Sequence, residues 1–441
     1  MSSRDGSSKS ALVYIASTSD GCPISLSDNT RVRSLVPQQY LTDDPAKADI
    51  ILLNTCAFDG KREARTVRII QELSEKYPGK KIFIGGCLPK IDDRLLSRLP
   101  HSGTFSLEEP ASISSLLAKE GLGAVMGCKV PYEHDVLVGE DLSDLRIENK
   151  ALQLIRRAFL FIETKLKVRI SPLRQIVSCS VVGEHSYLVL TGRGCTGNCA
   201  YCAIRYVRGS VKSRVLSDVL GDIRKGIEQG YSDIWLIGDD VGSWGQDLGS
   251  NSALLIQEIL KIEHNFRLVI TAFDPKWFVL FKDEMEAICG SRKVVLLTIP
   301  IQSGSARMVR SMCRQYDPQE VGARVSRLRA KNPHLLFKTH IMVGFPGETW
   351  SDFWQSIKEA FRYDIVVPLI FSPRYKTQAA LMEEQVGTVV KWVRFALLNL
   401  SIWMRFLFMI LSSFSVSIAR GESDPVRPHS RHEGGSRVTP K

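Results

Sequence analysis

The sequence lacks the features of a secreted, disulfide-linked protein. It has no N-terminal signal peptide, and its ten cysteines are spread over 441 residues. Disulfide frameworks are typical of small secreted domains, whereas thiols in a reducing compartment more often bind metals. We therefore expect a cytoplasmic protein whose cysteines serve metal sites.

No class of residue is extreme in abundance. Charged residues make up 24% and apolar residues 44% of the chain, as in ordinary globular proteins, and the length allows two or three domains. Lysine and arginine exceed aspartate and glutamate by 58 to 47, a net charge of +11 that suits a polyanionic partner. Many basic proteins bind no nucleic acid, so the charge alone leaves this open.

The most informative stretch is a loop with three closely spaced cysteines. Cys195, Cys199 and Cys202 form a C-x3-C-x2-C array. Thiolates are the usual ligands of iron–sulfur clusters, and three of them leave one iron of a four-iron cluster free to bind a small molecule. Structural zinc normally takes four ligands, so a zinc site is the weaker alternative. The overall cysteine usage also disfavours a disulfide.

This array, with Tyr201 before its last cysteine, resembles that of the radical S-adenosylmethionine (AdoMet) enzymes. The flanking residues 192–194 and 203–209 are similar to those of the methylthiotransferase branch. The resemblance implies that the three cysteines hold a [4Fe–4S] cluster whose open iron binds AdoMet, with Tyr201 near the cofactor. It also implies that the reduced cluster cleaves AdoMet to a 5′-deoxyadenosyl radical.

Three more cysteines each follow a predicted strand. Apolar runs at 11–15, 48–56 and 81–87 predict strands, and 62–77 predicts a helix, the order of a parallel α/β layer. Cys22, Cys56 and Cys87 lie at or beyond the carboxyl ends of these strands, which meet at one edge of a parallel sheet. Free cysteine is usually a small buried residue, and the residues alone favour that interpretation.

The resemblance reverses that preference. Gly21-Cys22, Asn54-Thr55-Cys56-Ala57 and Gly85-Gly86-Cys87 look like the N-terminal domain of methylthiotransferases, although residues 23–41 are shorter and less regular than that family suggests. The resemblance implies that Cys22, Cys56 and Cys87 hold a second [4Fe–4S] cluster, which helps to build or deliver a methylthio group. Cys179, Cys289 and Cys313 lie outside these motifs and are interpreted as structural.

Strands and helices alternate again from residue 186. Strands are predicted at 186–190, 233–237, 266–270, 294–300 and 335–343, and helices at 216–229, 253–262, 318–330 and 349–361. Asp317 and Pro318 give the third helix an N-cap and a first-turn proline. Repeated β/α units of this length indicate a whole or partial parallel barrel, whose active residues follow the strands.

The segments after these strands contain candidate ligand-binding residues. Gly238 and Asp240 follow one strand, where an acid could bind a ribose hydroxyl or an amino group, or could simply cap a turn. In the family a similar segment lies near AdoMet, although an amide commonly stands where this chain has Asp239. Gln302, in Gln302-Ser303-Gly304-Ser305, resembles the tRNA-directed members, as do Arg310 and Arg314 on a predicted helix over 307–316. Residues 344–349, Gly-Phe-Pro-Gly-Glu-Thr, complete the resemblance.

The C-terminal residues depart from the family. No alternating strands follow Ala380, where related enzymes usually have a small β-rich RNA-binding module. Residues 395–419 are strongly apolar, interrupted by Arg405, and long enough to span a bilayer. Arg405 would cost about 2.5–3.5 kcal/mol there if it faced lipid. We slightly prefer membrane association through 395–419. The alternatives are an amphipathic helix packed on the barrel, or an altered terminus.

The predicted organisation has five parts. These are a disordered leader (1–10), an N-terminal α/β methylthiotransferase domain (11–130), a linker (131–180), a β/α barrel (181–380) and an apolar helix with a disordered tail (381–441). The resemblance implies a transferase that adds a methylthio group to C2 of N6-threonylcarbamoyl- or N6-isopentenyl-adenosine at position 37, in the tRNA anticodon loop. Its electron donor would be a flavodoxin, a ferredoxin or a reductase. One alternative is methylthiolation of a ribosomal protein. Another is a catalytically degenerate iron–sulfur protein with an RNA-binding or regulatory role.

Overall fold

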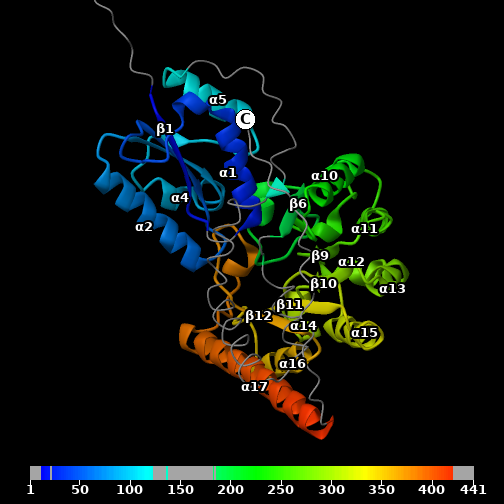
Figure 1. The fold of residues 1–441 in the computed structure, drawn as a ribbon. Helices are drawn as coiled ribbons and strands as arrows, with labels where there is room; N and C mark the ends of the chain where they lie inside the picture. The colour runs from blue at the N-terminus through cyan, green and yellow to red at the C-terminus, as the bar shows by residue number, and fades with distance from the viewer. Residues whose placement is uncertain (1–10, 20–21, 123–135, 138–181, 183–184, 421–441) are drawn as a thin grey trace, which may run out of the picture.

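The computed structural model describes residues 11–19, 22–122, 136–137, 182 and 185–420. They form two α/β units, each built on its own sheet (Figure 1). The predicted leader, most of the predicted linker, residues 421–441, and Cys128 and Cys179 lie outside the described residues.

The N-terminal unit is a four-stranded parallel sheet in the order β1-β2-β3-β4. All six residues of β2 are buried, as the apolar run predicts. Its strands are β1 (Val13–Ser17), β2 (Ile50–Thr55), β3 (Lys81–Gly86) and β4 (Gly103–Thr104). Its helices are α1 (Pro23–Leu35), α2 (Gly60–Lys76), α3 (Leu88–Ile91), α4 (Asp93–Leu96) and α5 (Pro110–Lys119), with a 3-10 turn at Gln38–Tyr40.

The second unit is an eight-stranded sheet in the order β12-β11-β10-β9-β8-β6-β5, with β7 on β6. Its strands are β5 (Val136–Leu137), β6 (Ser186–Arg193), β7 (Lys212–Ser213), β8 (Asp233–Gly238), β9 (Arg267–Ile270), β10 (Val294–Thr298), β11 (Leu336–Val343) and β12 (Ile365–Ile370). The strands from β6 to β12 along this order are parallel, whereas β5 and β7 run antiparallel to β6. Within the described chain β12 pairs only with β11, so the sheet is a partial barrel.

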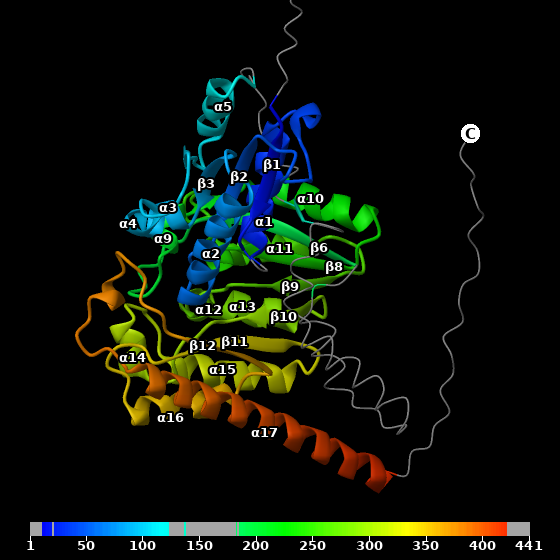
Figure 2. The ribbon, with the colours of Figure 1, turned by 90° about the vertical axis from the view of Figure 1, so that its left-hand side faces the viewer.

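Helices of this unit cover the outer face of the sheet, where the largest apolar core lies, whereas α9 (Ile204–Arg208) packs on the N-terminal unit beside α3 (Figure 1 and Figure 2). The other helices are α10 (Leu216–Glu228), α11 (Ser252–Leu260), α12 (Pro275–Leu280), α13 (Lys282–Gly290), α14 (Ala306–Ser311), α15 (Pro318–Lys331), α16 (Trp350–Ala360) and α17 (Thr388–Arg420), with 3-10 turns at Val241–Ser243 and Gln378–Ala380. Asp317 caps α15 through the backbone N–H groups of Gln319 and Glu320, as predicted.

The inner face of the sheet packs against the N-terminal unit. Ile24 and Leu26 of α1 share a core cluster with Leu190, Trp235 and Leu336 of the second sheet. The segment 23–41, expected to be irregular, is therefore largely a helix, which begins at Pro23 and lies between the two sheets. Its polar residues Ser27 and Asp28 are buried, so the sequence shows little helical periodicity there.

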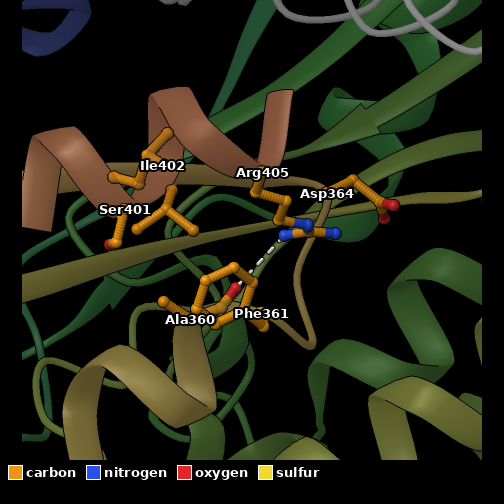
Figure 3. A pocket seen from close by; sticks show the side chains of 7 residues that line it. Ala360, Phe361, Asp364, Ser401, Ile402 and Arg405 are labelled. Atoms are coloured by element: carbon orange, nitrogen blue, oxygen red, sulfur yellow. Dashed lines mark hydrogen bonds between the residues drawn. The ribbon is translucent and has the colours of Figure 1, made fainter. Parts of the chain in front are cut away.

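The apolar segment 395–419 belongs to α17, which packs beside β12 and α16 (Figure 2). Arg405 donates hydrogen bonds to the carbonyl oxygens of Ala360, at 3.3 Å, and Tyr363, which lie at and beyond the end of α16 (Figure 3). Arg405 and Ala360 line a small pocket together with Ser401 and Ile402. In this region the helix packs on the barrel, and the preferred expectation of membrane insertion is not supported.

Among the described residues, no helix combines the length and the apolarity needed to cross a membrane.

Candidate active site

The loop with Cys195, Cys199 and Cys202 follows β6 and is held by neighbouring segments. Gly194 has a φ of +77°, and a Cβ there would lie 2.2 Å from the carbonyl oxygen of Ser210, so only glycine fits. Its N–H donates to Asp239 Oδ2 at 2.8 Å. Asp239, which stands where the family commonly has an amide, therefore anchors the loop.

The three thiols are half-buried and close enough for their charges to act on one another. Burial raises the pKa of Cys202 to about 12, and the neighbouring Cys199 adds to that rise. Burial also raises the pKa of Cys195, with further contributions from Asp240 and from the other two thiols. The N–H of Gly197 donates to Cys195 Sγ at 3.1 Å. The donor set is therefore three convergent thiols, as an iron–sulfur cluster requires.

The three N-terminal cysteines also come together. Cys22 precedes α1, Cys56 follows β2, and Cys87 follows β3. Burial raises the pKa of all three thiols, and the charges of Cys22 and Cys56 contribute to the rise at Cys87. The strand ends therefore bring these cysteines to one edge of the sheet, as the resemblance implies.

The backbone around Cys87 is tightly constrained. Gly86 has a φ of +86°, and a Cβ there would lie 2.4 Å from the carbonyl oxygen of Thr55. The N–H of Cys87 donates to that same oxygen at 2.8 Å. On the neighbouring strand, the N–H of Cys56 donates to Thr18 Oγ1 at 2.9 Å. These bonds fix two of the cysteines relative to each other.

The two cysteine groups fit a cluster better than a single ion. Among the described residues, no three His, Cys, Asp or Glu side chains lie close enough together to hold one metal ion. Neither group is therefore a preformed zinc site. A cube of iron and sulfide spreads its cysteine ligands over different irons and suits a wider arrangement.

Asp240 lies against the loop cysteines. Its carboxylate accepts hydrogen bonds from Trp277 Nε1 at 2.9 Å and from the N–H of Gly242 at 3.1 Å, and Cys195 Sγ lies 3.8 Å from its Oδ2. Burial, and then the nearby Asp274, raise its pKa to about 6. Gly238 pairs with Gly192 of β6, and a Cβ there would make only ordinary contacts at 3.4 Å.

Gln302 sits beside β11 in a left-handed conformation, with a φ of 61°. Its N–H donates to the carbonyl oxygen of His340 at 2.8 Å, and its own carbonyl accepts from the N–H of Met342 at 2.7 Å. The side chain is buried, yet its Oε1 has no hydrogen-bond partner among the described residues. Such an acceptor is expected to be satisfied by a ligand or water.

The hydroxyl group of Tyr201 is hydrogen-bonded to another side chain of the protein. It accepts a hydrogen bond from Arg314 Nη1 at 2.7 Å, and Arg314 Nη2 binds Asp274 Oδ2 at 2.8 Å. Arg314 was predicted on a helix, but α14 ends at Ser311 and Arg314 is buried beside the loop cysteines. Arg310 lies in the last turn of that helix.

Cys289 is buried in the core, whereas Cys313 is exposed.

Residues that sequence reasoning missed join the two cysteine groups. Asp28 of α1 binds both Arg193 of β6 and Arg208 of α9. Asp239 raises the pKa of both Cys22 and Cys202, while Arg208 lowers that of Cys22. Asp239 is therefore near a cysteine of each group, whereas Arg208 is near the N-terminal cysteines. The only sequence signal for these residues is that Arg193 and Arg208 flank the cysteine loop.

Comparisons with known proteins agree with this arrangement. Residues 189–360 match the Radical SAM superfamily, and residues 14–105 match the family described as Uncharacterized protein family UPF0004. A solved structure, the radical AdoMet methyltransferase TsrM from Kitasatospora setae, has the same fold at 14% identity, with a TM-score of 0.54 over 84% of this chain and 77% of that one.

Curated relatives align over both units. A probable threonylcarbamoyladenosine tRNA methylthiotransferase from Pyrococcus horikoshii is 31% identical over 355 residues, covering 80% of this chain and 74% of that protein. A tRNA-2-methylthio-N(6)-dimethylallyladenosine synthase from Carboxydothermus hydrogenoformans is 30% identical over 388 residues, covering 84% and 79%. With the cysteine loop, the second cysteine group and the two-unit fold in agreement, the chain belongs to the radical AdoMet methylthiotransferase family, and it is a transferase.

Proposed function

We propose that this chain adds a methylthio group to C2 of a hypermodified adenosine at position 37 of tRNA. The observation that carries the proposal is the presence of two groups of three cysteines, both close enough to Asp239 for its charge to act on Cys22 of one group and Cys202 of the other. The names of the Pyrococcus and Carboxydothermus relatives support tRNA as the substrate. The excess of basic residues is consistent with a polyanionic partner.

The two cysteine groups would hold two [4Fe–4S] clusters. Cys195, Cys199 and Cys202 would bind the cluster that chelates AdoMet, and Cys22, Cys56 and Cys87 would bind the auxiliary cluster. When bound, these groups supply a radical for C–H activation and the sulfur that is transferred. A flavodoxin, a ferredoxin or a reductase would supply electrons.

Side chains of the barrel would orient AdoMet. The Asp240 carboxylate is fixed by Trp277 and Gly242 beside Cys195, where it can accept hydrogen bonds from AdoMet. Gly238 ends the adjoining strand and would lie near the cofactor. The unpaired Oε1 of Gln302 would accept from a ligand donor, since an unsatisfied buried acceptor costs about 1–3 kcal/mol. Because the Tyr201 hydroxyl already binds Arg314, Tyr201 would mainly position the loop.

The proposal is tested by nucleoside mass spectrometry. Anaerobically reconstituted protein would be incubated with AdoMet, sulfide, a reductant and tRNA bearing either modified adenosine. We expect a 2-methylthio product from the wild type, none from Cys202→Ala, and 5′-deoxyadenosine without that product from Cys87→Ala. The control Cys289→Ala, in the core of the barrel, should keep activity.

Two other results would contradict the proposal. Release of 5′-deoxyadenosine without any modified tRNA would redirect the search to ribosomal proteins. Absence of both products, with both clusters present by iron content, would favour a degenerate binding or regulatory protein.

A further inference from the structure

The inner face of β11 carries two basic side chains. Residues of a strand alternate between faces, and Phe337 and Ile341 pack in the core under the outer helices. Leu336 belongs instead to the inner cluster with α1. Lys338 and His340, at steps of two from Leu336, therefore face the inner side, on the same face as the ligand space of a β/α barrel.

The strand register places Lys338 next to an apolar row on the inner face of the sheet, on the side towards the carboxyl ends of the strands. Trp235, Val269, Leu296 and Leu336 occupy successive aligned positions on four neighbouring strands and share the inner cluster. The next aligned pair towards the carboxyl ends is Thr298 and Lys338. Lys338 is thus the first charged residue of β11 after this apolar row, counting towards the carboxyl end of the strand. It lies five residues before the end of β11 at Val343, about 16 Å along the strand.

The ammonium of Lys338 has no anionic partner among the described residues. Burial alone lowers its pKa, with no carboxylate to offset it. The charges that act on His340 are also cationic, those of Lys338 and Arg314, and burial lowers the His340 pKa to about 3. Arg314 is already paired with Asp274. Lys338 is half-buried, and charges withdrawn from water in proteins are normally paired, so this one invites a ligand anion.

We propose that Lys338 binds a ligand carboxylate on the inner face of the barrel, namely that of an N6-threonylcarbamoyl-adenosine. This inference rests on the proposed function. AdoMet also carries a carboxylate, but the loop cysteines that would hold its cluster follow β6 at the carboxyl edge of the sheet, well above Lys338. An N6-isopentenyl group has no charge and could not satisfy the ammonium.

The test measures equilibrium binding to the reconstituted full-length protein. Threonylcarbamoyl-adenosine nucleoside, isopentenyl-adenosine nucleoside and AdoMet are compared for the wild type, Lys338→Met, Lys338→Arg and the exposed surface control Lys358→Met. We expect Lys338→Met to weaken threonylcarbamoyl-adenosine binding at least about tenfold, since a hydrogen bond to a charged group is lost. Lys338→Arg should recover part of the affinity, and AdoMet binding should not change.

Other outcomes decide against the inference. Loss of AdoMet affinity alone would assign the ammonium to the AdoMet carboxylate and overturn the substrate assignment. Equal affinities in all four proteins would overturn the carboxylate site itself. Thermal unfolding checks folding, and Lys338→Met should be at least as stable as the wild type because it removes a half-buried cation that has no anionic partner among the described residues.

The inference and the proposed function can fail separately. If the wild type methylthiolates only isopentenylated tRNA, the function stands and the inference fails. If it binds the threonylcarbamoyl nucleoside through Lys338 but modifies no tRNA, the inference stands and the function fails.

Discussion

The carboxylate of Asp28 and the guanidinium of Arg208 meet 2.5 Å apart across the boundary between the two units. Asp28 also binds Arg193, whose Nη2 donates to Ser27 Oγ at 2.9 Å. Asp28 is 1% exposed, so one buried carboxylate bridges two arginines that flank the cysteine loop, and Arg208 also binds Glu108 at 3.4 Å.

We predict that Asp28→Asn destabilises the protein by about 3–5 kcal/mol, because it removes the buried carboxylate of two ion pairs with largely buried guanidinium groups. The measurement is the free energy of unfolding in urea. The control is Asp43→Asn, which removes the exposed partner of Arg33 and should cost no more than about 1 kcal/mol. Equal small losses in both variants would show that the Asp28 pair adds nothing.

Gly86→Ala should displace Cys87 and remove only the auxiliary cluster. The new Cβ would collide with the backbone of Thr55, to which Cys87 is hydrogen-bonded. We expect iron per chain to fall by about half after reconstitution, with AdoMet cleavage retained. Gly79→Ala is the matched control, since Gly79 has a similar φ of +85° but nothing within 4 Å of its Cβ position. Full iron content in Gly86→Ala would refute the role of this glycine.

Arg394→Leu should destabilise the protein by about 3–5 kcal/mol. Arg394 of α17 binds Glu348 at 2.7 Å, and both side chains are almost fully buried. Without the arginine, the pKa of Glu348, which burial already raises, should rise further. The double variant Glu348→Gln/Arg394→Leu should recover part of the loss in denaturant unfolding. No recovery would mean that the loss comes from packing instead of the unpaired carboxylate.

Because of His340, the free energy of unfolding should decrease in mild acid. Its pKa is about 3 in the folded protein and about 6.5 when unfolded, so below pH 6.5 the unfolded chain binds a proton that the folded chain does not. The stability should therefore decrease by about 1.4 kcal/mol per pH unit below 6.5. Between pH 7 and 5, His340→Gln should lose about 2 kcal/mol less than the wild type. The exposed His264→Gln is the control, and an unchanged pH dependence in His340→Gln would contradict this prediction.

Sequence patterns were sufficient where burial alone sets the structure. The buried run of β2 and the N-cap of α15 are both found as predicted. β12 was missed because Pro368 argues against a strand; within the described sheet it pairs only with β11, and an edge strand tolerates proline. The helices α12 and α13 were also missed.

The cysteines of the candidate site could be predicted, but their surroundings could not. Spacing and resemblance identified the two groups, since cluster ligands must be cysteines near strand ends. The contacts between Asp28 and Arg208 join residues 180 positions apart, and no local pattern marks such a pair. Lys338 was overlooked for a related reason: one lysine in an apolar strand is notable only when its neighbours on the sheet are known.

The inner apolar cluster combines side chains from α1 with side chains from five strands of the barrel. Pulling the units apart would expose this apolar surface to water and break the Asp28 ion pairs. We therefore expect the separation between the two cysteine groups to be set when the chain folds. If the N-terminal group supplies the sulfur, as proposed, the substrate nucleotide would have to move to it, because this packing disfavours movement of the N-terminal unit towards the substrate.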